Sequence, residues 1–202
     1  GEIFLALDGD TSFDNQMVHR ASAHFRNANV VAVTGPMRVR NASASIVTRL
    51  QSLEYMLSMQ AGKLGLTEIN VINNVPGAFG IFRKSFLQQI GGWNTGTAED
   101  LDLTLRIKQY QGRHPELRFE FEPGAVSHTD VPDKLIDFLK QRLRWDGDLL
   151  YIYANKHRLG ISASIMGWNN FIFIMWYGIL FQIVMPFTIV LYMIYMIVVL
   201  PM

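Results

Sequence analysis

The 202-residue sequence lacks cysteine and lacks an excess of either charge. Without cysteine the chain forms no disulfide bond, which is consistent with a reducing compartment. Lysine and arginine together number 18, aspartate and glutamate 17, so the net charge is +1 at pH 7. Surfaces that bind nucleic acid carry a strong excess of positive charge. The composition therefore gives no reason to expect a nucleic acid as a partner.

Charged residues are missing altogether from the last part of the sequence. After Arg158 there is no Asp, Glu, Lys, Arg or His, and residues 171–200 are almost wholly apolar. A helix needs about 20 apolar residues to cross a bilayer core about 30 Å thick. We therefore expect a transmembrane segment within residues 161–202, kinked or divided at Pro186. The alternative is a buried core helix, although such helices rarely run so long without a charge.

Basic residues gather shortly before this apolar segment. They are Lys140, Arg142, Arg144, Lys156 and Arg158. By the positive-inside rule, they place the upstream domain on the cytoplasmic side of the cell membrane. We expect residues 134–158 to lie along that membrane face as an interfacial helix.

Strand-like and helix-like patterns alternate through the upstream part. Apolar runs at 3–7 and 30–34 flank a helical segment at 13–27, and this order is typical of a parallel α/β sheet. Further elements are expected in chain order at 45–63 (helix), 75–82 (strand), 97–111 (helix), 119–121 and 125–128 (short strands) and 133–155 (helix).

Two carboxylates follow the first expected strand, in the sequence Asp8-Gly9-Asp10. Ligands of open α/β sheets bind at the carboxyl ends of strands, but Asp-Gly is also common in plain turns. An EF-hand is excluded because its sixth and twelfth positions would be Phe13 and His19. Two chemical uses remain: a phosphohydrolase with Asp8 as nucleophile and Asp10 as acid and base, or a divalent cation held against a substrate diphosphate.

A second acidic pair, Glu99-Asp100, opens the expected helix at 97–111, with Thr97 as its predicted N-cap. Negative charge in a first helical turn is favoured by the helix dipole, which is the structural explanation for both acids. Two further features complete the pattern. They are the strand segment Gly77-Ala78-Phe79-Gly80 and the helical segment Gln141-Arg142-Leu143-Arg144-Trp145.

In this order the four features resemble the membrane-bound family 2 glycosyltransferases, the processive synthases of cellulose, chitin, hyaluronan and poly-N-acetylglucosamine. The family signature is an Asp-x-Asp, a Thr-Glu-Asp and a Gln-x-x-Arg-Trp motif, followed by an interfacial helix and transmembrane segments. Ala98 stands here in place of the threonine. We expect that difference to be minor because the chemistry rests on the aspartate.

The resemblance implies an α/β fold, namely the C-terminal part of a GT-A-like nucleotide-sugar transferase domain with a mixed, mainly parallel sheet. It implies a metal-dependent, inverting transfer of sugar from a UDP-sugar to a growing polysaccharide or other glycan acceptor at the cytoplasmic membrane face. The implied cofactor is Mg²⁺ or Mn²⁺. The lipid bilayer and accessory membrane subunits are the further partners that it implies.

The resemblance also assigns roles to the donor-side residues. A diphosphate leaving group needs a metal and cations to stabilise its charge. Asp10, with Asp8 beside it, is expected to hold the metal. Arg144 and Arg142, together with Gln141, are expected to bind the diphosphate.

On the acceptor side, the resemblance makes Asp100 the general base that takes the proton of the acceptor hydroxyl. The expected acceptor-binding residues are Gly77, Ala78, Phe79, Glu99 and Trp145. The Trp145 ring offers a flat face to a sugar, whereas its structural alternative is a core tryptophan of an amphipathic helix. Gly77 and Gly80 would let the backbone approach the acceptor, which is compatible with a β-bulge. His128 is a further candidate metal ligand, against the alternative of a hydrogen-bonded structural histidine.

The chain departs from the family at both ends. The opening strands and the aspartate that holds the uracil base would precede Gly1, and a hydrophobic run ends at Met202. We therefore expect a fragment, inactive on its own, in three parts: a partial catalytic domain at 1–131, the Gln-x-x-Arg-Trp and interfacial helices at 132–160, and a truncated transmembrane segment at 161–202.

Two other functional classes compete with a transferase. A phosphohydrolase of the haloacid dehalogenase type would use Asp8 and Asp10, but it leaves residues 141–145 and the apolar segment without a role. It would also want a later lysine and an acidic pair at a strand end. A non-catalytic membrane receptor or scaffold on a degenerate transferase domain is the second alternative. Retention of every catalytic carboxylate argues against it.

Overall fold

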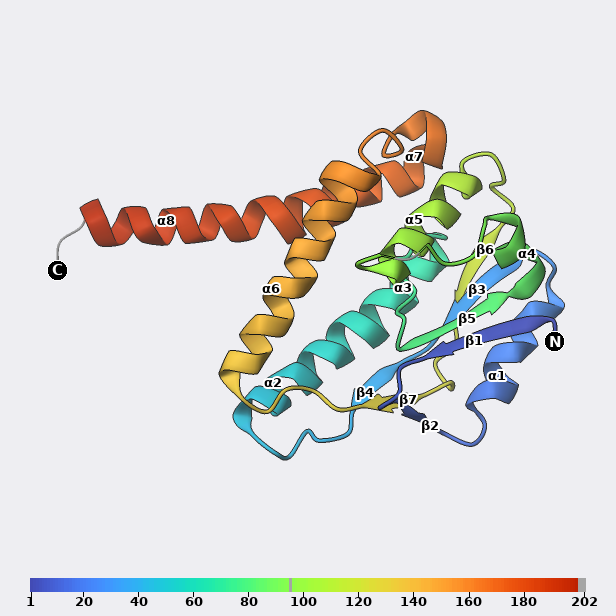
Figure 1. Cartoon of the computed structure of the whole chain (residues 1–202), viewed down its shortest axis with the longest axis horizontal. Helices are drawn as coiled ribbons and strands as arrows, with labels where there is room; N and C mark the ends of the chain where they lie inside the picture. The colour runs from blue at the N-terminus through green and yellow to red at the C-terminus, as the bar shows by residue number, and fades with distance from the viewer. Residues whose placement is uncertain (95, 200–202) are drawn as a thin grey trace.

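A computed structural model describes residues 1–94 and 96–199. Its centre is a four-stranded sheet in the order β1–β5–β3–β6 (Figure 1). The strands are β1 (Ile3–Leu7), β3 (Val30–Thr34), β5 (Phe79–Arg83) and β6 (Arg118–Phe121). β5 runs antiparallel to both β1 and β3, and β3 runs parallel to β6. β1, β3 and β6 therefore share one direction, and the predicted mixed, mainly parallel sheet is confirmed.

The strand–helix–strand unit at the start of the chain was predicted with its two strands parallel, which is correct. The two strands are not neighbours in the sheet. β1 and β3 are parallel, yet β5 lies between them and pairs with both. The strand expected at 75–82 begins only at Phe79. Residues 76–78 instead form the loop that leads into β5, next to the end of β1.

A smaller sheet has the order β2–β7–β4, from β2 (Ser12–Phe13), β7 (Ser127–Thr129) and β4 (Met37–Val39). Phe13 pairs with Ser127 in this sheet, so the prediction of a helix from residue 13 is wrong at its start. The helix α1 spans Met17–Ala23 and continues as the 3₁₀ turn η1 (His24–Arg26). β4 was not expected from the sequence.

Helices cover both faces of the larger sheet, which places a hydrophobic core on each side. On one face, α1 and Tyr55 pack against Val33 and Phe79. On the other, α4 (Lys84–Gln89) and α5 (Glu99–Gln111) pack against Phe82 and Phe119. All five residues of β3 are buried, as expected for a central strand covered on both faces. The short helix α4 was not expected from the sequence.

A long helix follows β4 in the chain, so the helix expected at 45–63 is confirmed and extends to residue 68. It consists of α2 (Ile46–Tyr55), the π-helical segment η2 (Met56–Gly62) and α3 (Lys63–Glu68). Ser45 begins it through a reciprocal cap with Thr48. The helix ends at residue 68 because the chain turns there into the loop at 70–78.

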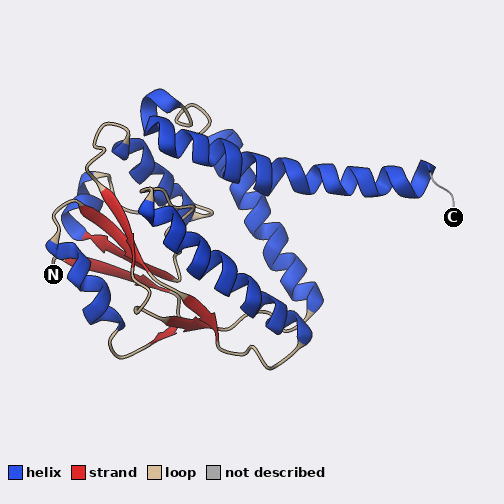
Figure 2. Ribbon diagram, turned by 180° about the vertical axis from the view of Figure 1, so that it is seen from behind, coloured by secondary structure: helices blue, strands red, loops and turns tan. Residues whose placement is uncertain are grey.

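The helix expected at 133–155 is confirmed as α6 (Leu135–Tyr151) continued by the π-helical segment η3 (Ile152–Lys156). It lies beside α2 in both views (Figures 1 and 2). Two hydrogen bonds fix the entry to α6 against α2. Ser45 Oγ donates to the Asp133 carbonyl (2.8 Å) and Gln51 Nε2 to the Pro132 carbonyl (2.8 Å).

The chain ends in a 37-residue helix, the one helix of the described residues that is long and apolar enough to cross a membrane. It comprises α7 (Ala163–Phe173), the π-helical segment η4 (Ile174–Val184) and α8 (Met185–Val199), which projects away from the sheets (Figure 1). The backbone leaves helical geometry at Gly167 (φ 77°), while the chain stays helical through Pro186. The apolar segment is therefore not divided at Pro186. That proline stands where the π-helical pattern gives way to the α-helical one. The last residues of the predicted segment, 200–202, lie outside the described residues.

Candidate active site

The end of β1 and the start of β5 bring the first two sequence features together. Leu7 pairs with Phe79, so Asp8 and Asp10 emerge beside the loop that carries Gly77. The Asp8 carbonyl accepts a hydrogen bond from the Thr11 amide (3.1 Å), which closes the turn after the strand. Both the turn and the strand-tip interpretations of these carboxylates therefore apply.

Asp100 reaches the same place from the first turn of α5. Its Oδ2 accepts hydrogen bonds from Asn74 Nδ2 (3.2 Å) and from the Gly77 amide (3.3 Å). Its Oδ1 accepts from the Leu101 amide (2.7 Å). The aspartate is thus oriented by the loop before β5. Asn74 was missed from the sequence because nothing in its local pattern distinguishes it from an ordinary loop asparagine.

The predicted N-cap at Thr97 is wrong. Ala98, in the left-handed conformation (φ 52°), is the residue that precedes α5. Its methyl side chain cannot accept a capping hydrogen bond. Thr97 instead donates its hydroxyl hydrogen bond to Asp148 of α6. This contact joins the loop before Asp100 to the helix that carries Trp145.

Four carboxylates share this corner of the molecule. Burial raises the pKa of Asp8, and the charges of Asp10, Glu99 and Asp100 raise it further, whereas Arg144 lowers it. The sequence features of both acidic pairs and of α6 are therefore within electrostatic reach of one another. Negative charge of this density is chemically suited to a divalent cation.

No group of three or more His, Asp or Glu side chains suited to a metal occurs in the part of the chain that the structure describes. A cation held by two protein carboxylates would take its remaining ligands from substrate oxygens and water. His128 lies on β7 opposite Ser12, and its Nε2 is 3.3 Å from Asp14 Oδ1. Its contact is thus with Asp14, and its role as a metal ligand stays a prediction.

Arg40 holds the backbone of the loop that follows β1. Its guanidinium donates to the Asp10 carbonyl (3.1 Å) and to Ser12 Oγ (3.0 Å). Two further hydrogen bonds to Asp130 (3.1 and 2.7 Å) fix the arginine itself. This clamp joins segments far apart in sequence, so no local signal could have identified it.

The two arginines predicted for phosphate binding have different surroundings. Arg142 donates two hydrogen bonds to the Glu54 carboxylate of α2 (2.8 and 2.7 Å). Its guanidinium carbon also lies 4.7 Å from the centre of the Trp145 ring. Arg144 is the one whose charge acts on Asp8. Gln141 Oε1 is buried and has no hydrogen-bond partner among the described residues.

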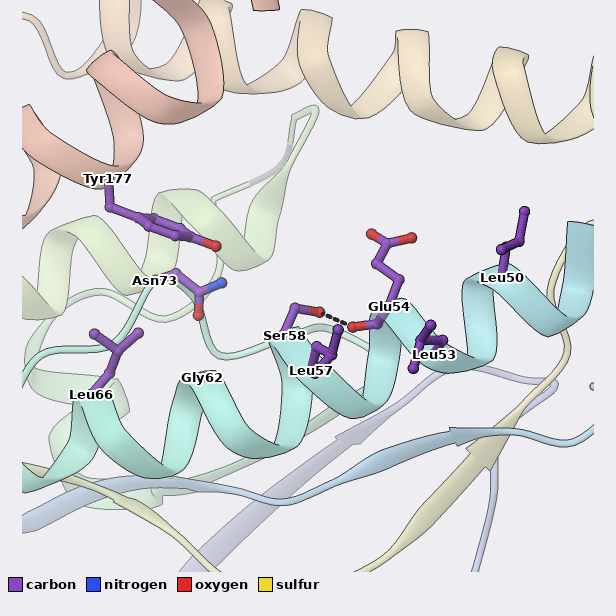
Figure 3. A pocket seen from close by; sticks show the side chains of 9 residues that line it. All are labelled: Leu50, Leu53, Glu54, Leu57, Ser58, Gly62, Leu66, Asn73 and Tyr177. Carbon is purple, nitrogen blue, oxygen red and sulfur yellow. Dashed lines mark hydrogen bonds between the residues drawn. The ribbon is translucent and has the colours of Figure 1, made fainter. Parts of the chain in front are cut away.

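A cavity of about 610 Å³ opens between the α2–α3 helix and η4 (Figure 3). Its walls are largely leucine, with Glu54, Ser58, Asn73 and Tyr177 as the polar members. Glu54 connects the cavity to Arg142, and Asn73 adjoins the residue that holds Asp100. The cavity is therefore linked to Trp145 through Glu54 and Arg142, and to Asp100 through Asn73 and Asn74.

Comparison with known proteins decides the family. A family profile described as "Glycosyl transferase family group 2" matches residues 3–202. The chain belongs to the family 2 glycosyltransferases. The predicted resemblance is therefore confirmed, and with it the assignment of the chain to the glycosyltransferases.

Curated relatives of this glycosyltransferase include poly-β-1,6-N-acetyl-D-glucosamine synthases. The protein of that name from Staphylococcus epidermidis is 31% identical over 146 residues, which are 71% of this chain and 34% of the relative. The one from Staphylococcus aureus strain COL is 32% identical over 145 residues, 70% of this chain and 33% of the relative. The chain thus spans about a third of the length of these relatives.

Among solved structures, the transferase is similar to a mannosyltransferase from Pyrobaculum calidifontis in complex with GDP-mannose and Mn²⁺. The TM-score is 0.57 with 16% sequence identity, over 83% of this chain and 44% of the other. At this identity the likeness concerns the fold. The predicted GT-A-like fold is confirmed.

Proposed function

We propose that this chain carries the catalytic corner of a membrane-bound polysaccharide synthase, which transfers a sugar with inversion from a UDP-sugar to a glycan acceptor. The observation that carries the proposal is the meeting of Asp8, Asp10, Asp100 and Arg144 at the tip of β1. The names of the staphylococcal relatives support N-acetylglucosamine as the sugar. The metal complex of the mannosyltransferase supports a divalent cofactor.

In the proposed mechanism, Asp8 and Asp10 would hold Mg²⁺ or Mn²⁺, and the bound cation would supply positive charge to the leaving diphosphate. Arg144 adds a positive charge on the same side, with Gln141 on the same helix as a further donor-side residue. Asp100, held by Asn74 and Gly77, removes the proton from the acceptor hydroxyl as the new glycosidic bond forms. The proton passes from that hydroxyl to the carboxylate.

We assign the acceptor to the side formed by the loop before β5, Glu99 and Trp145. We assign to the acceptor the cavity between the α2–α3 helix and η4 as well (Figure 3), because its apolar walls and few polar groups can bind a sugar ring. Gly77 and Ala78 are partly exposed and would present backbone on the acceptor side, whereas Phe79 is fully buried and its carbonyl accepts a hydrogen bond from Thr34. Trp145 would offer its ring to the sugar, and the contact of that ring with Arg142 helps to keep it in place.

The phosphohydrolase alternative is disfavoured by the family assignment and by the position of Asp100 at a helix start. The experiment that tests the proposal uses the protein at its full natural length in membranes. Labelled UDP-sugars and GDP-sugars are supplied with Mg²⁺ or Mn²⁺, and the products are sized. Polymer formed from one UDP-sugar supports the proposal. Absence of any sugar transfer from the whole panel, by protein that still binds nucleotide sugars, supports a non-catalytic receptor or scaffold.

Glu54 and Arg142 give a prediction about acceptor binding. Reversing either charge, by Glu54→Arg or Arg142→Glu, should release Trp145 and increase the share of donor hydrolysed to free sugar. We expect the same result for Trp145→Ala. The double exchange should restore transfer, with a coupling of about 1 kcal/mol. We expect no more, because Glu54 is 43% exposed and water screens the pair. Equal hydrolysis in the single and double variants would contradict this role.

The membrane arrangement is also a proposal. We place the helix at 163–199 across the cell membrane and residues 134–158 along its cytoplasmic face, because apolar side chains remain exposed on both. Washing membranes with alkaline carbonate should leave the protein in the pellet. A cysteine placed at Lys140 should react with a membrane-impermeant maleimide only in inside-out vesicles. Release into the soluble fraction, or labelling in right-side-out vesicles, would contradict the arrangement.

A further inference from the structure

Lys63, the first residue of α3, is almost completely buried, with 1% of its surface exposed. Its ammonium donates one hydrogen bond, to the backbone carbonyl of Asn74 (3.0 Å). Burial lowers the pKa of Lys63 to about 7, and the charge of Asp100 opposes that effect. A buried amine is costly unless something favours its positive charge.

Asn74 connects this lysine to Asp100. Its backbone carbonyl accepts from Lys63, and its side-chain amide donates to Asp100 Oδ2 (3.2 Å). The Gly77 amide donates to the same carboxylate oxygen (3.3 Å). Movement of the Asn74 backbone would therefore change the orientation of the aspartate.

The other charged residues near α3 do not explain how a protonated Lys63 is stabilised. β6 packs against α3 and carries Arg118 and Glu120, which pair with each other at 3.3 Å. Asp100, at the start of α5, is the charge that favours the protonated form of Lys63.

A second buried lysine, Lys108 of α5, offers a matched comparison. It is also fully buried, and burial alone lowers its pKa to about 7. Its ammonium lies 4.9 Å from the centre of the Phe173 ring and has no hydrogen-bond partner among the described residues. Burial of a lysine is thus common to both positions, but the connection to Asp100 is particular to Lys63.

We propose that Lys63 is a positioning residue for the catalytic base: it fixes the backbone of Asn74, whose side-chain amide orients Asp100. This inference rests on the proposed function, in which Asp100 removes the acceptor proton. Lys63 itself touches neither substrate. Its contribution is to hold the base ready from the buried side of the site.

The test is Lys63→Met in the protein at its full natural length, since methionine has a similar shape and no charge. Turnover should fall about tenfold, because the Asn74 backbone loses the hydrogen bond that fixes it and Asp100 is then held less precisely. Nucleotide-sugar affinity should stay within threefold. In the unmodified protein, turnover should decline as the pH rises through about 7, where Lys63 loses its proton, and the variant should lack that decline.

Control variants separate positioning from folding. Lys108→Met should keep the pH profile of the unmodified protein. Asn74→Ala should lower turnover about as much as Lys63→Met, and the double variant should be no worse than either. An unchanged pH profile in Lys63→Met overturns the inference. The inference is also overturned if Lys108→Met loses as much turnover as Lys63→Met for the same fall in melting temperature. If Asp100→Asn retains turnover, the proposed base itself fails. If Asp100→Asn is inactive but Lys63→Met behaves normally, only this inference fails.

Discussion

Asp100→Asn is expected to lower turnover by about 10²-fold or more while nucleotide-sugar affinity stays within a few-fold. Asparagine keeps the shape of the side chain but cannot accept a proton from the acceptor hydroxyl. Its Oδ1 can still accept the hydrogen bond from the Leu101 amide, so the first turn of α5 should persist. The loss should therefore appear in the chemical step and not in donor binding.

A purely structural role for Asp100 predicts a different result. As a helix-dipole partner it would contribute roughly 0.3–1 kcal/mol to stability and little to turnover. Donor affinity, turnover and melting temperature measured on the same variant separate the two roles. The matched control is Glu116→Gln. Glu116 is an exposed carboxylate after α5 and pairs with His114. Near-normal turnover in Asp100→Asn would remove this residue as the base.

Local patterns predicted much of the fold because they report local physics. The apolar runs at β1 and β3, the helical periodicity of α2 and the uncharged final segment each identify an element. Motif order then predicted which elements carry the chemistry. What the sequence did not indicate is the insertion of β5 between β1 and β3, since strand pairing depends on contacts between distant segments.

The residues of the candidate site also fall into those that the sequence indicated and those that it did not. Asp8, Asp10 and Asp100 stand at element ends that are visible in the sequence, and the structure brings them together. Their supporting residues were not visible. Arg40 and Lys63 donate to backbone carbonyls, and a backbone carbonyl leaves no trace in residue identity. Asn74 donates its side-chain amide to Asp100, 26 positions away in the sequence.

The segment at 141–145 shows how a short pattern can hold two functions. In a helix, Gln141, Arg144 and Trp145 share a face because three and four residues separate them. Arg142 instead pairs with Glu54 of α2, and its guanidinium also contacts the Trp145 ring. The family resemblance made both arginines candidates for binding the diphosphate. The ion pair with Glu54 leaves Arg144 as the stronger one, and our proposal for diphosphate binding rests on it.

The second large effect is expected for Asp10→Asn, which should abolish the metal-dependent part of nucleotide-sugar binding. The diphosphate would lose its protein-anchored cation, because an amide is a much weaker ligand for Mg²⁺ or Mn²⁺ than a carboxylate. Titration of a UDP-sugar with and without Mn²⁺ measures the effect. Asp14→Asn, just after β2, should retain the response to the metal.

The same substitution should not destabilise the protein when metal is absent. The charge of Asp10 is among the causes that raise the pKa of Asp8, so the two carboxylates repel each other in the folded chain. Where folding raises the pKa of a carboxyl group, the folded protein loses stability as the pH rises through the titration range of that group. Removing the neighbouring charge relieves that loss, and the melting temperature of Asp10→Asn at pH 7 in EDTA should equal or exceed that of the unmodified protein. Loss of donor binding together with a lower melting temperature would indicate a structural role for Asp10. Donor binding that survives in the variant and ignores EDTA would exclude a metal at this strand tip.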